Sequence, residues 1–308
     1  MTSGARRKVR TPHLGIGASA VNSFLSWFLN IVLGDDFVLM VTMFTLVGVA
    51  EYYFPAQRIP REYYALNLRY AVVNVFAVGT LAPFLSLGAA YAIQKVGFGF
   101  IDLRALGFEG IGGSLFALFV GTLIWDLFQY WQHRAEHGIK LFWRLQVLHH
   151  CDEHMNVTTA SRHHILEQVL APVFVTIPTA IIFQVPPVTI AILLLIPYAW
   201  LYFTHANIDL GFGPYWWLLV SPNYHRVHHS LAPEHIDRNF VNWFPLWDIL
   251  FGTAVLPRWS ECPSTGVAGV SVLQQAYLLP FKGGQQMLSR QVNDGLPSRR
   301  PQDTLPSA

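Results

Sequence analysis

Histidines occur in this chain at spacings that suit metal binding. On a helix, residues three and four positions apart share one face, so such a cluster can direct two or three side chains at one point. An apolar core would be harmed by these rings, because each ring nitrogen needs a polar partner. Imidazole is a common ligand of iron, zinc and copper. The pattern therefore predicts a multi-histidine metal centre. The three clusters are His133 and His137; Gln146, His149 and His150; and His225, His228 and His229.

The composition indicates that lipid surrounds much of the chain. The 308 residues are 53% hydrophobic and 12% charged, whereas soluble domains average about 25% charged residues. So little charge leaves too few polar side chains to solvate a globule. A net charge of +2 does not support nucleic-acid binding. The two cysteines, Cys151 and Cys262, form no disulfide framework and have no metal-binding spacing.

Six apolar stretches approach the ~20 residues that a helix needs to cross a bilayer. The first carries polar residues four positions apart, which also suits an interfacial helix, so four to six crossings fit. The distribution of basic residues places the N-terminus and residues 132–167 and 205–308 in the cytoplasm. We therefore expect an all-α integral membrane protein with a histidine-rich helical cap on its cytoplasmic face. The stretches are 14–33, 37–54, 72–93, 111–131, 168–185 and 187–204.

The same pattern divides the chain into four parts. Residues 1–36 form a basic N-terminus with an interfacial or first membrane helix, and 37–110 form transmembrane helices. Residues 111–255 form the histidine-containing domain, including a membrane hairpin at 168–204. Residues 256–308 form a C-terminal segment, which we expect to be disordered from about 282 because it is polar and rich in proline and serine.

Two further histidines stand at predicted membrane exits on the same side as the clusters. We expect His164 and His205 to complete the ligand set, with His163 as the alternative to His164. Nine imidazoles exceed what one metal accepts, so they predict two metals with about four or five ligands each. Nitrogen ligands disfavour magnesium, calcium and manganese. Zinc and iron both remain open by affinity, and iron suits O2 chemistry at a site that lipid and electrons can reach.

Four other polar residues are expected behind the ligands. Asp126 is an ionisable group within an apolar run, which is costly and usually functional. We expect it to accept a hydrogen bond from a ligand histidine and to fix the ring tautomer. Tyr130, Glu167 and Asn207 are expected to support the site in the same way.

The histidine clusters and their surroundings resemble the fatty acid hydroxylase/sterol desaturase superfamily. Residues 126–137, 142–150 and 225–229 are similar to its first, second and third histidine boxes. Residues 156–162 resemble the segment after the second box, and Asn239 with residues 247–253 resembles the closing motif. The resemblance covers roughly residues 110–255. A single histidine motif is weak, but the ordered set is specific.

The resemblance implies a membrane-embedded, di-iron, O2-dependent oxidase that hydroxylates or desaturates a lipid such as a sterol or fatty acyl chain. It also implies an external electron donor, either cytochrome b5-like or ferredoxin-type. The sequence departs from the family pattern at Gln146, where the second box usually begins with histidine, and at Ile165, where proline is usual. We expect Gln146 to offer its amide oxygen to a metal, directly or through water, as a weaker ligand.

Three other functions remain open. A membrane metal transporter would need ligands along a path near the bilayer midplane, whereas these clusters gather at one face. A zinc hydrolase would need an acidic base beside few histidines. The change at Gln146 also keeps open a metal-binding family member with altered or lost catalysis.

Overall fold

The computed structural model describes residues 16–97, 99–101, 110–183, 196, 198–256 and 262–267. Within these ranges the regular structure is helical, and extended pairing is limited to isolated bridges such as Pro55 with Ile208. The all-α prediction is confirmed for this part of the chain. Part of the expected 168–204 hairpin and the tail from 282 lie outside the described residues.

Four long helices precede the histidine-rich region. Three helical stretches among the described residues are long and apolar enough to cross a membrane: Leu25–Tyr53, Arg61–Val96 and Gly110–Gly138. They give the architecture of a multi-pass membrane protein, and the cytoplasmic orientation stays a prediction. A shorter apolar helix, Pro172–Ile182, contains η3 (Pro172–Thr176) and α6 (Ile177–Ile182). The long helices are α1 (Ile16–Val32), α2 (Asp35–Tyr53), α3 (Arg61–Val96) and α4 (Gly110–Gly138).

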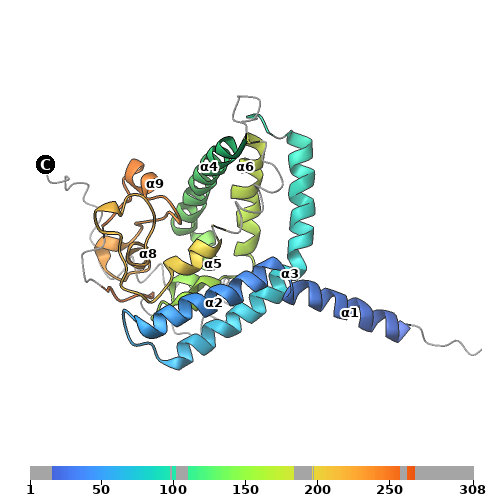
Figure 1. Cartoon of the computed structure of the whole chain (residues 1–308), viewed down its shortest axis with the longest axis horizontal. Coiled ribbons are helices and arrows are strands. Elements are labelled where there is room, and N and C mark those ends of the chain that lie inside the picture. Colours follow the sequence, from blue (N-terminus) through green and yellow to red (C-terminus); the bar gives the residue numbers. More distant parts are fainter. Residues whose placement is uncertain are drawn as a thin grey trace, which may run out of the picture.

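Helix α3 is longer than a membrane crossing requires and is bent (Figure 1). Its 36 residues would extend about 54 Å, against about 30 Å of hydrocarbon. Pro83 stands inside the helix and cannot bond to the carbonyl of Gly79, which explains a bend at this level. The first half carries buried Asn67 and Asn74 and contacts η1 (Val157–Ser161), while the far end meets α6. The bend therefore lets one helix serve both the histidine-rich region and the apolar helices.

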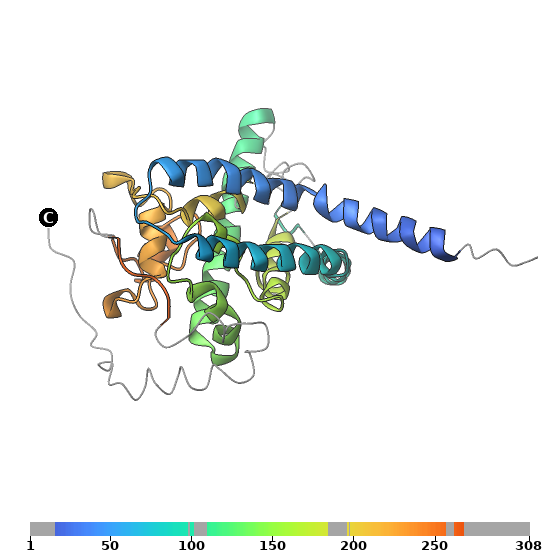
Figure 2. The ribbon, with the colours of Figure 1, turned by 90° about the horizontal axis from the view of Figure 1, so that it is seen from below.

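The histidine-rich cap follows α4 and is built from short elements. Figures 1 and 2 show α5 and α8 gathered at one end of the long helices. The short elements are α5 (Lys140–His150), η1, η2 (Glu167–Val169), η4 (Gly213–Tyr215), α8 (Pro222–His228), η5 (Pro233–His235) and α9 (Leu246–Leu250).

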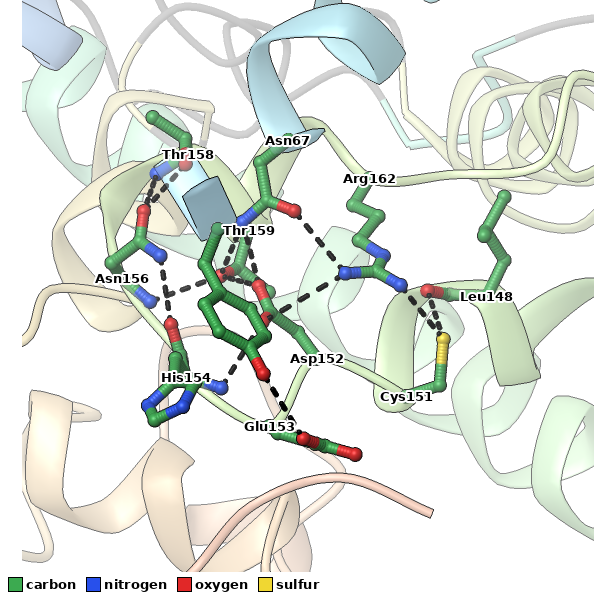
Figure 3. A network of polar contacts seen from close by, with 11 residues as sticks. Asn67, Leu148, Cys151, Asp152, Glu153, His154, Asn156, Thr158, Thr159 and Arg162 are labelled. Atoms are coloured by element: carbon green, nitrogen blue, oxygen red, sulfur yellow. Dashed lines mark hydrogen bonds and ion pairs between the residues drawn. The ribbon is translucent and has the colours of Figure 1, made fainter. Parts of the chain in front are cut away.

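A buried polar network attaches the cap to α3 (Figure 3). Asn67 of α3 and the hydroxyl of Thr159 each donate to one oxygen of Asp152 at 2.6 Å. Arg162 donates to Asn67 Oδ1 at 3.2 Å and to Cys151 Sγ at 3.0 Å. Burial raises the pKa of the Cys151 thiol to about 12, so it stays protonated. The network fixes the backbone that immediately follows α5, where His149 and His150 stand.

Candidate metal centre

The structure brings eight of the nine predicted histidines into two groups. Within each group, one ring nitrogen per histidine lies within 4.8 Å of the others. The rings come from α4, α5, α8 and the loop after α8, and His205 comes from the end of the helical segment before 206. The first group contains His133, His137, His150 and His228, and the second contains His149, His205, His225 and His229.

Two pairs of adjacent histidines, His149–His150 and His228–His229, are each divided between the two groups. His149 points to the second group and His150 to the first, and their ring planes are perpendicular, with centroids 5.4 Å apart. His228 and His229 divide in the same way, at 86° and 5.3 Å. Neighbouring residues on a helix are about 100° apart, so a histidine pair naturally serves two points. The two groups therefore lie side by side.

In the first group, backbone and carboxylate oxygens decide which ring nitrogen carries the proton. The Nδ1 atoms of His133 and His228 lie 2.7 Å from the carbonyl oxygens of Phe240 and Arg238. His137 Nδ1 faces a carboxylate oxygen of Asp237 at 3.4 Å. Because backbone carbonyl oxygens only accept, the Nδ1 atoms of His133 and His228 donate, and their Nε2 atoms keep a lone pair. The nearby Asp237 carboxylate favours the same tautomer in His137.

Those lone pairs meet in the centre of the group. His150 Nε2 lies 3.1 Å from His137 Nε2 and 3.2 Å from His228 Nε2. The Nε2 atom of His133 is buried and has no hydrogen-bond partner. His150 Nε2 can donate a proton to only one of the His137 and His228 nitrogens, so the convergence of these rings fits a metal ion.

The second group has the same character. His205 donates from Nδ1 to the Leu201 carbonyl at 2.7 Å, which leaves a lone pair on Nε2. That Nε2 lies 3.0 Å from Nε2 of both His149 and His225, and His229 Nε2 lies 3.2 Å from that of His225. Four nitrogens thus converge, and the two groups together are consistent with a di-metal site.

Burial keeps these rings neutral. It lowers the pKa of His205 to about 3 and lowers the pKa values of His149, His150 and His225 well below the ordinary value. Repulsion from neighbouring imidazoles adds to the effect. His228 and His229 have pKa values lowered for the same reasons. Neutral imidazole is the form that binds a metal, so the site is ready for binding at neutral pH.

The closing segment of the cap orients the first group, a role the sequence analysis did not assign. Asp248, fully buried, accepts the backbone N–H groups of Phe240 and Val241 at 2.9 and 3.2 Å. Asn239 has a φ of 55° and bonds through its side chain to Val255 and Tyr224. Both contacts hold the Phe240 carbonyl against His133. The sequence did contain an indication of this role, because Asn239 and Asp248 both belong to the residues that resemble the closing motif of the family.

Asp126 has a different partner from the predicted one. Its two oxygens accept the backbone N–H groups of Trp243 and Phe244 at 3.1 and 2.9 Å, instead of an imidazole. Asp126 therefore affects the ligands indirectly: it fixes the backbone of the segment whose Phe240 carbonyl accepts from His133. Tyr130 is fully buried, packs edge-on against Phe240 and bonds to Thr253 at 3.1 Å.

Asn207 fastens the chain beyond His205. Its backbone N–H donates to Glu51 of α2 at 2.7 Å, and its side chain bonds to the backbone of Gln57. The same oxygen of Glu51 accepts the N–H of Val157 at 2.7 Å. One buried carboxylate of α2 thus joins two loops of the cap, one of which begins beside a histidine of the second group.

His164 lies outside both groups, and the backbone N–H of Leu166 donates to its Nδ1 at 3.1 Å. His163 stacks on His149, with centroids 4.6 Å apart, and turns both nitrogens to oxygens, at 2.7 Å from Glu167 and 3.0 Å from the Ala160 carbonyl. Although burial opposes the charged form, the Glu167 carboxylate raises the pKa of His163. No lone pair is left for a metal, so His163 does not replace His164. Gln146 is buried, and its Oε1 has no hydrogen-bond partner.

Comparison with known proteins identifies this part of the chain. Residues 118–253 match the family described as Fatty acid hydroxylase, and this range contains all eight grouped histidines. Residues 118–253 therefore form a region of the fatty acid hydroxylase family. The predicted resemblance is therefore confirmed.

This chain aligns with only part of each similar protein. Alkylglycerol monooxygenase from Xenopus tropicalis is 33% identical over 42% of this chain and 28% of the frog protein. The Homo sapiens protein of the same name is 30% identical over 45% and 30% of the two chains. Ornithine lipid hydroxylase OlsE from Rhizobium tropici is 27% identical over 50% and 46%. The chain thus spans less than half the length of these relatives. No solved structure matches the chain.

Proposed function

We propose that this protein is a membrane-bound, di-iron, O2-dependent oxidase that hydroxylates a lipid. The observation that supports this most directly is the pair of adjacent, buried four-histidine groups at one end of apolar helices. A metal transporter would need ligands along the helices at membrane depth. Here the eight nitrogens form two closed groups, which suits a resident metal pair better than a passing ion.

The protein residues supply position, protonation state and exclusion of water. When bound, two irons would supply the activation of O2 and the removal of hydrogen from an unactivated C–H bond. The eight imidazoles would hold them. The carbonyls of Phe240, Arg238 and Leu201 hold three of the rings with Nε2 directed inward. Burial of the rings limits water at the site, which favours a reaction on an apolar chain over side reactions.

Hydroxylation is favoured over desaturation, and a lipid with a polar headgroup over a sterol. The matched relatives are named for alkylglycerol and ornithine lipid, and their names describe monooxygenation or hydroxylation. A substrate in the bilayer would reach the cap along the apolar helices. The electron donor is proposed to be a separate cytochrome b5-like or ferredoxin-type protein acting from the cytoplasmic side.

Gln146 is proposed as a weak or water-mediated ligand that supplements one group. It stands three residues before His149 on α5, and its buried amide oxygen has no hydrogen-bond partner. A neutral amide oxygen binds iron less strongly than imidazole, so the position remains exchangeable. His164 was predicted as a ligand, but it lies outside both groups, and we propose that it supports the site without binding a metal.

The test combines metal analysis with lipid profiling. The purified protein should contain two metals per chain, and cells that express it should accumulate one lipid with an added oxygen. His225→Ala should abolish that product and lower the metal content. His154→Ala is the matched control, since His154 belongs to neither group and its ring meets Tyr63 edge-on. Full metal content and product in His225→Ala would refute the proposal. Two bound metals with no oxidised lipid would favour the catalytically altered family member.

A further inference from the structure

The segment between Arg238 and residue 257 offers no charge to its surroundings. Its only ionisable side chain, Asp248, is fully buried. The four donors around that carboxylate are the backbone N–H groups of Phe240 and Val241 and the hydroxyls of Tyr224 and Thr253. Around α9, by contrast, the exposed side chains are apolar: Leu246 (37%), Ile249 (43%), Leu250 (62%) and Phe251 (39%). Contiguous exposed apolar side chains mark an interaction surface.

The path of this segment follows the membrane helix α4 towards its middle. It starts at the Phe240 carbonyl, which bonds to His133. The backbone of residues 243 and 244 then meets Asp126, and the ring of Phe244 reaches Phe119, with centroids 6.0 Å apart. Phe119 stands fourteen residues before His133, or about 21 Å along the helix axis.

The segment then returns along the same helix. The indole N–H of Trp247 donates to the Leu123 carbonyl at 3.2 Å, and Phe251 packs on Trp131 with centroids 4.9 Å apart. Figure 1 shows α9 beside α4 rather than beyond its end, displaced from α8 towards the apolar helices. Trp131 ends the predicted membrane stretch 111–131, where an interfacial aromatic residue is expected, so the turn at α9 is expected on the lipid side of it.

From these contacts we infer that residues 243–251 are embedded in the hydrocarbon of the bilayer as a re-entrant turn. Phe119 lies twelve residues from Trp131, or about 18 Å, which is near the midplane of a 30 Å hydrocarbon layer. The sequence alone placed this region in the cytoplasm. The surface formed by Leu246, Ile249, Leu250 and Phe251 is therefore covered by lipid acyl chains.

The backbone of the segment meets the condition that lipid imposes. Non-helical backbone is tolerated at membrane depth only where the protein satisfies its polar groups. The N–H groups of Trp243 and Phe244 donate to Asp126, and the Trp243 carbonyl accepts from Val220 at 2.8 Å. The backbone N–H groups of Ile249 and Phe251 donate to the carbonyl oxygens of Pro245 and Trp247 at 2.9 and 3.0 Å. Because Asp126 accepts the backbone N–H groups where this segment enters the bilayer, its presence within the apolar run of α4 is also explained.

Depth-dependent fluorescence quenching tests the inference. The full chain carries Cys262→Ser, which leaves only Cys151, a buried thiol at 1% exposure. A bimane label is attached to Leu250→Cys in vesicles that contain lipid with a nitroxide midway along its acyl chain. Leu115→Cys, on exposed α4, is the lipid reference, and Glu234→Cys, on exposed η5, is the aqueous reference. Ile249→Cys repeats the test at a second position.

Nitroxide lipid should reduce emission at Leu250→Cys as strongly as at Leu115→Cys, and several times more strongly than at Glu234→Cys. Iodide in the aqueous phase should give the reverse order. If the labels at both Leu250→Cys and Ile249→Cys respond as Glu234→Cys does, the inference is overturned. Shielding from both quenchers would also overturn it, because a second copy of the chain would then cover the surface. Loss of bound metal in a labelled variant identifies misfolding, and the other position then decides.

Discussion

Replacing Asp248 with asparagine is expected to loosen one metal of the centre and leave the other in place. Each oxygen of Asp248 accepts two donors, of which one is a backbone N–H, from Phe240 or Val241. Asparagine has one oxygen and one NH2 group, so one of these N–H groups would face a donor. A buried N–H without an acceptor costs about 1–3 kcal/mol. The strain falls on the loop whose Phe240 carbonyl directs His133 into the first group.

The expected size of the effect follows from two general magnitudes. A factor of ten in affinity corresponds to about 1.4 kcal/mol, and partners that orient ligand histidines are worth about 10–100-fold in metal affinity. We therefore expect one metal per chain to leave about 10–100 times more readily to a competing chelator. Among the described residues, the hydrogen bonds and ring contacts of this loop reach histidines of the first group and not those of the second, so the second metal should behave as in the unaltered protein.

Metal release against a graded series of chelator affinities measures this directly. Asp209→Asn is the matched control, because Asp209 is exposed and its oxygen accepts from Asn223 at 2.7 Å. Folding is checked by thermal unfolding of both variants. If Asp248→Asn keeps both metals as tightly as Asp209→Asn, the orienting role is refuted. Equal loosening of both metals would point to general unfolding and would also contradict the reasoning.

Three further outcomes are expected. In the metal-free protein, imidazoles of the unfolded chain bind protons below about pH 6.5, whereas the buried rings of the folded chain, with their lowered pKa values, do not. The free energy of unfolding should therefore fall as the pH falls below about 6.5, by up to about 1.4 kcal/mol per pH unit for each ring. Denaturant unfolding in detergent between about pH 7.5 and 5.5 measures this, and a flat profile would contradict it. Glu51→Ala should cost about 2–6 kcal/mol, because two buried N–H groups lose their acceptor, whereas Glu51→Gln keeps an oxygen for both and should stay close to the unaltered protein. Equal thermal stability of the two variants would refute this. Arg162→Ala should destabilise the cap by about 3–5 kcal/mol, since the Asp152 carboxylate loses its buried cationic partner. An unchanged melting temperature would show that the network of Figure 3 does not hold the cap to α3.

Local features of the centre could be predicted from the sequence. Spacings of three and four residues depend only on helix geometry, so the clusters around His133, His149 and His228 were assigned to a metal centre before any contact was known. His205 was found because it ends an apolar stretch on the predicted side. The helical class and the long apolar helices likewise follow from composition and periodicity.

Long-range pairings could not be read from the sequence. Asp126 was expected to orient an imidazole, but its donors stand at Trp243 and Phe244, more than a hundred residues away. Periodicity reports which side chains share a face and does not name their partner. For the same reason the roles of Asp248 and of the Phe240 carbonyl could not be predicted, because every residue has a main-chain carbonyl and the residue type does not indicate what that oxygen contacts.

The division of the His149–His150 and His228–His229 pairs between the two groups has a mechanical consequence for the centre. A single peptide unit connects His149 with His150, and another connects His228 with His229, so the separation of the two groups is set twice by covalent geometry. Neither α5 nor α8 can slide or rotate to widen one coordination sphere without distorting its neighbour. Replacing the bound metal with another metal should therefore alter the metal–nitrogen bond lengths within each group, while the distance between the two metals stays constant.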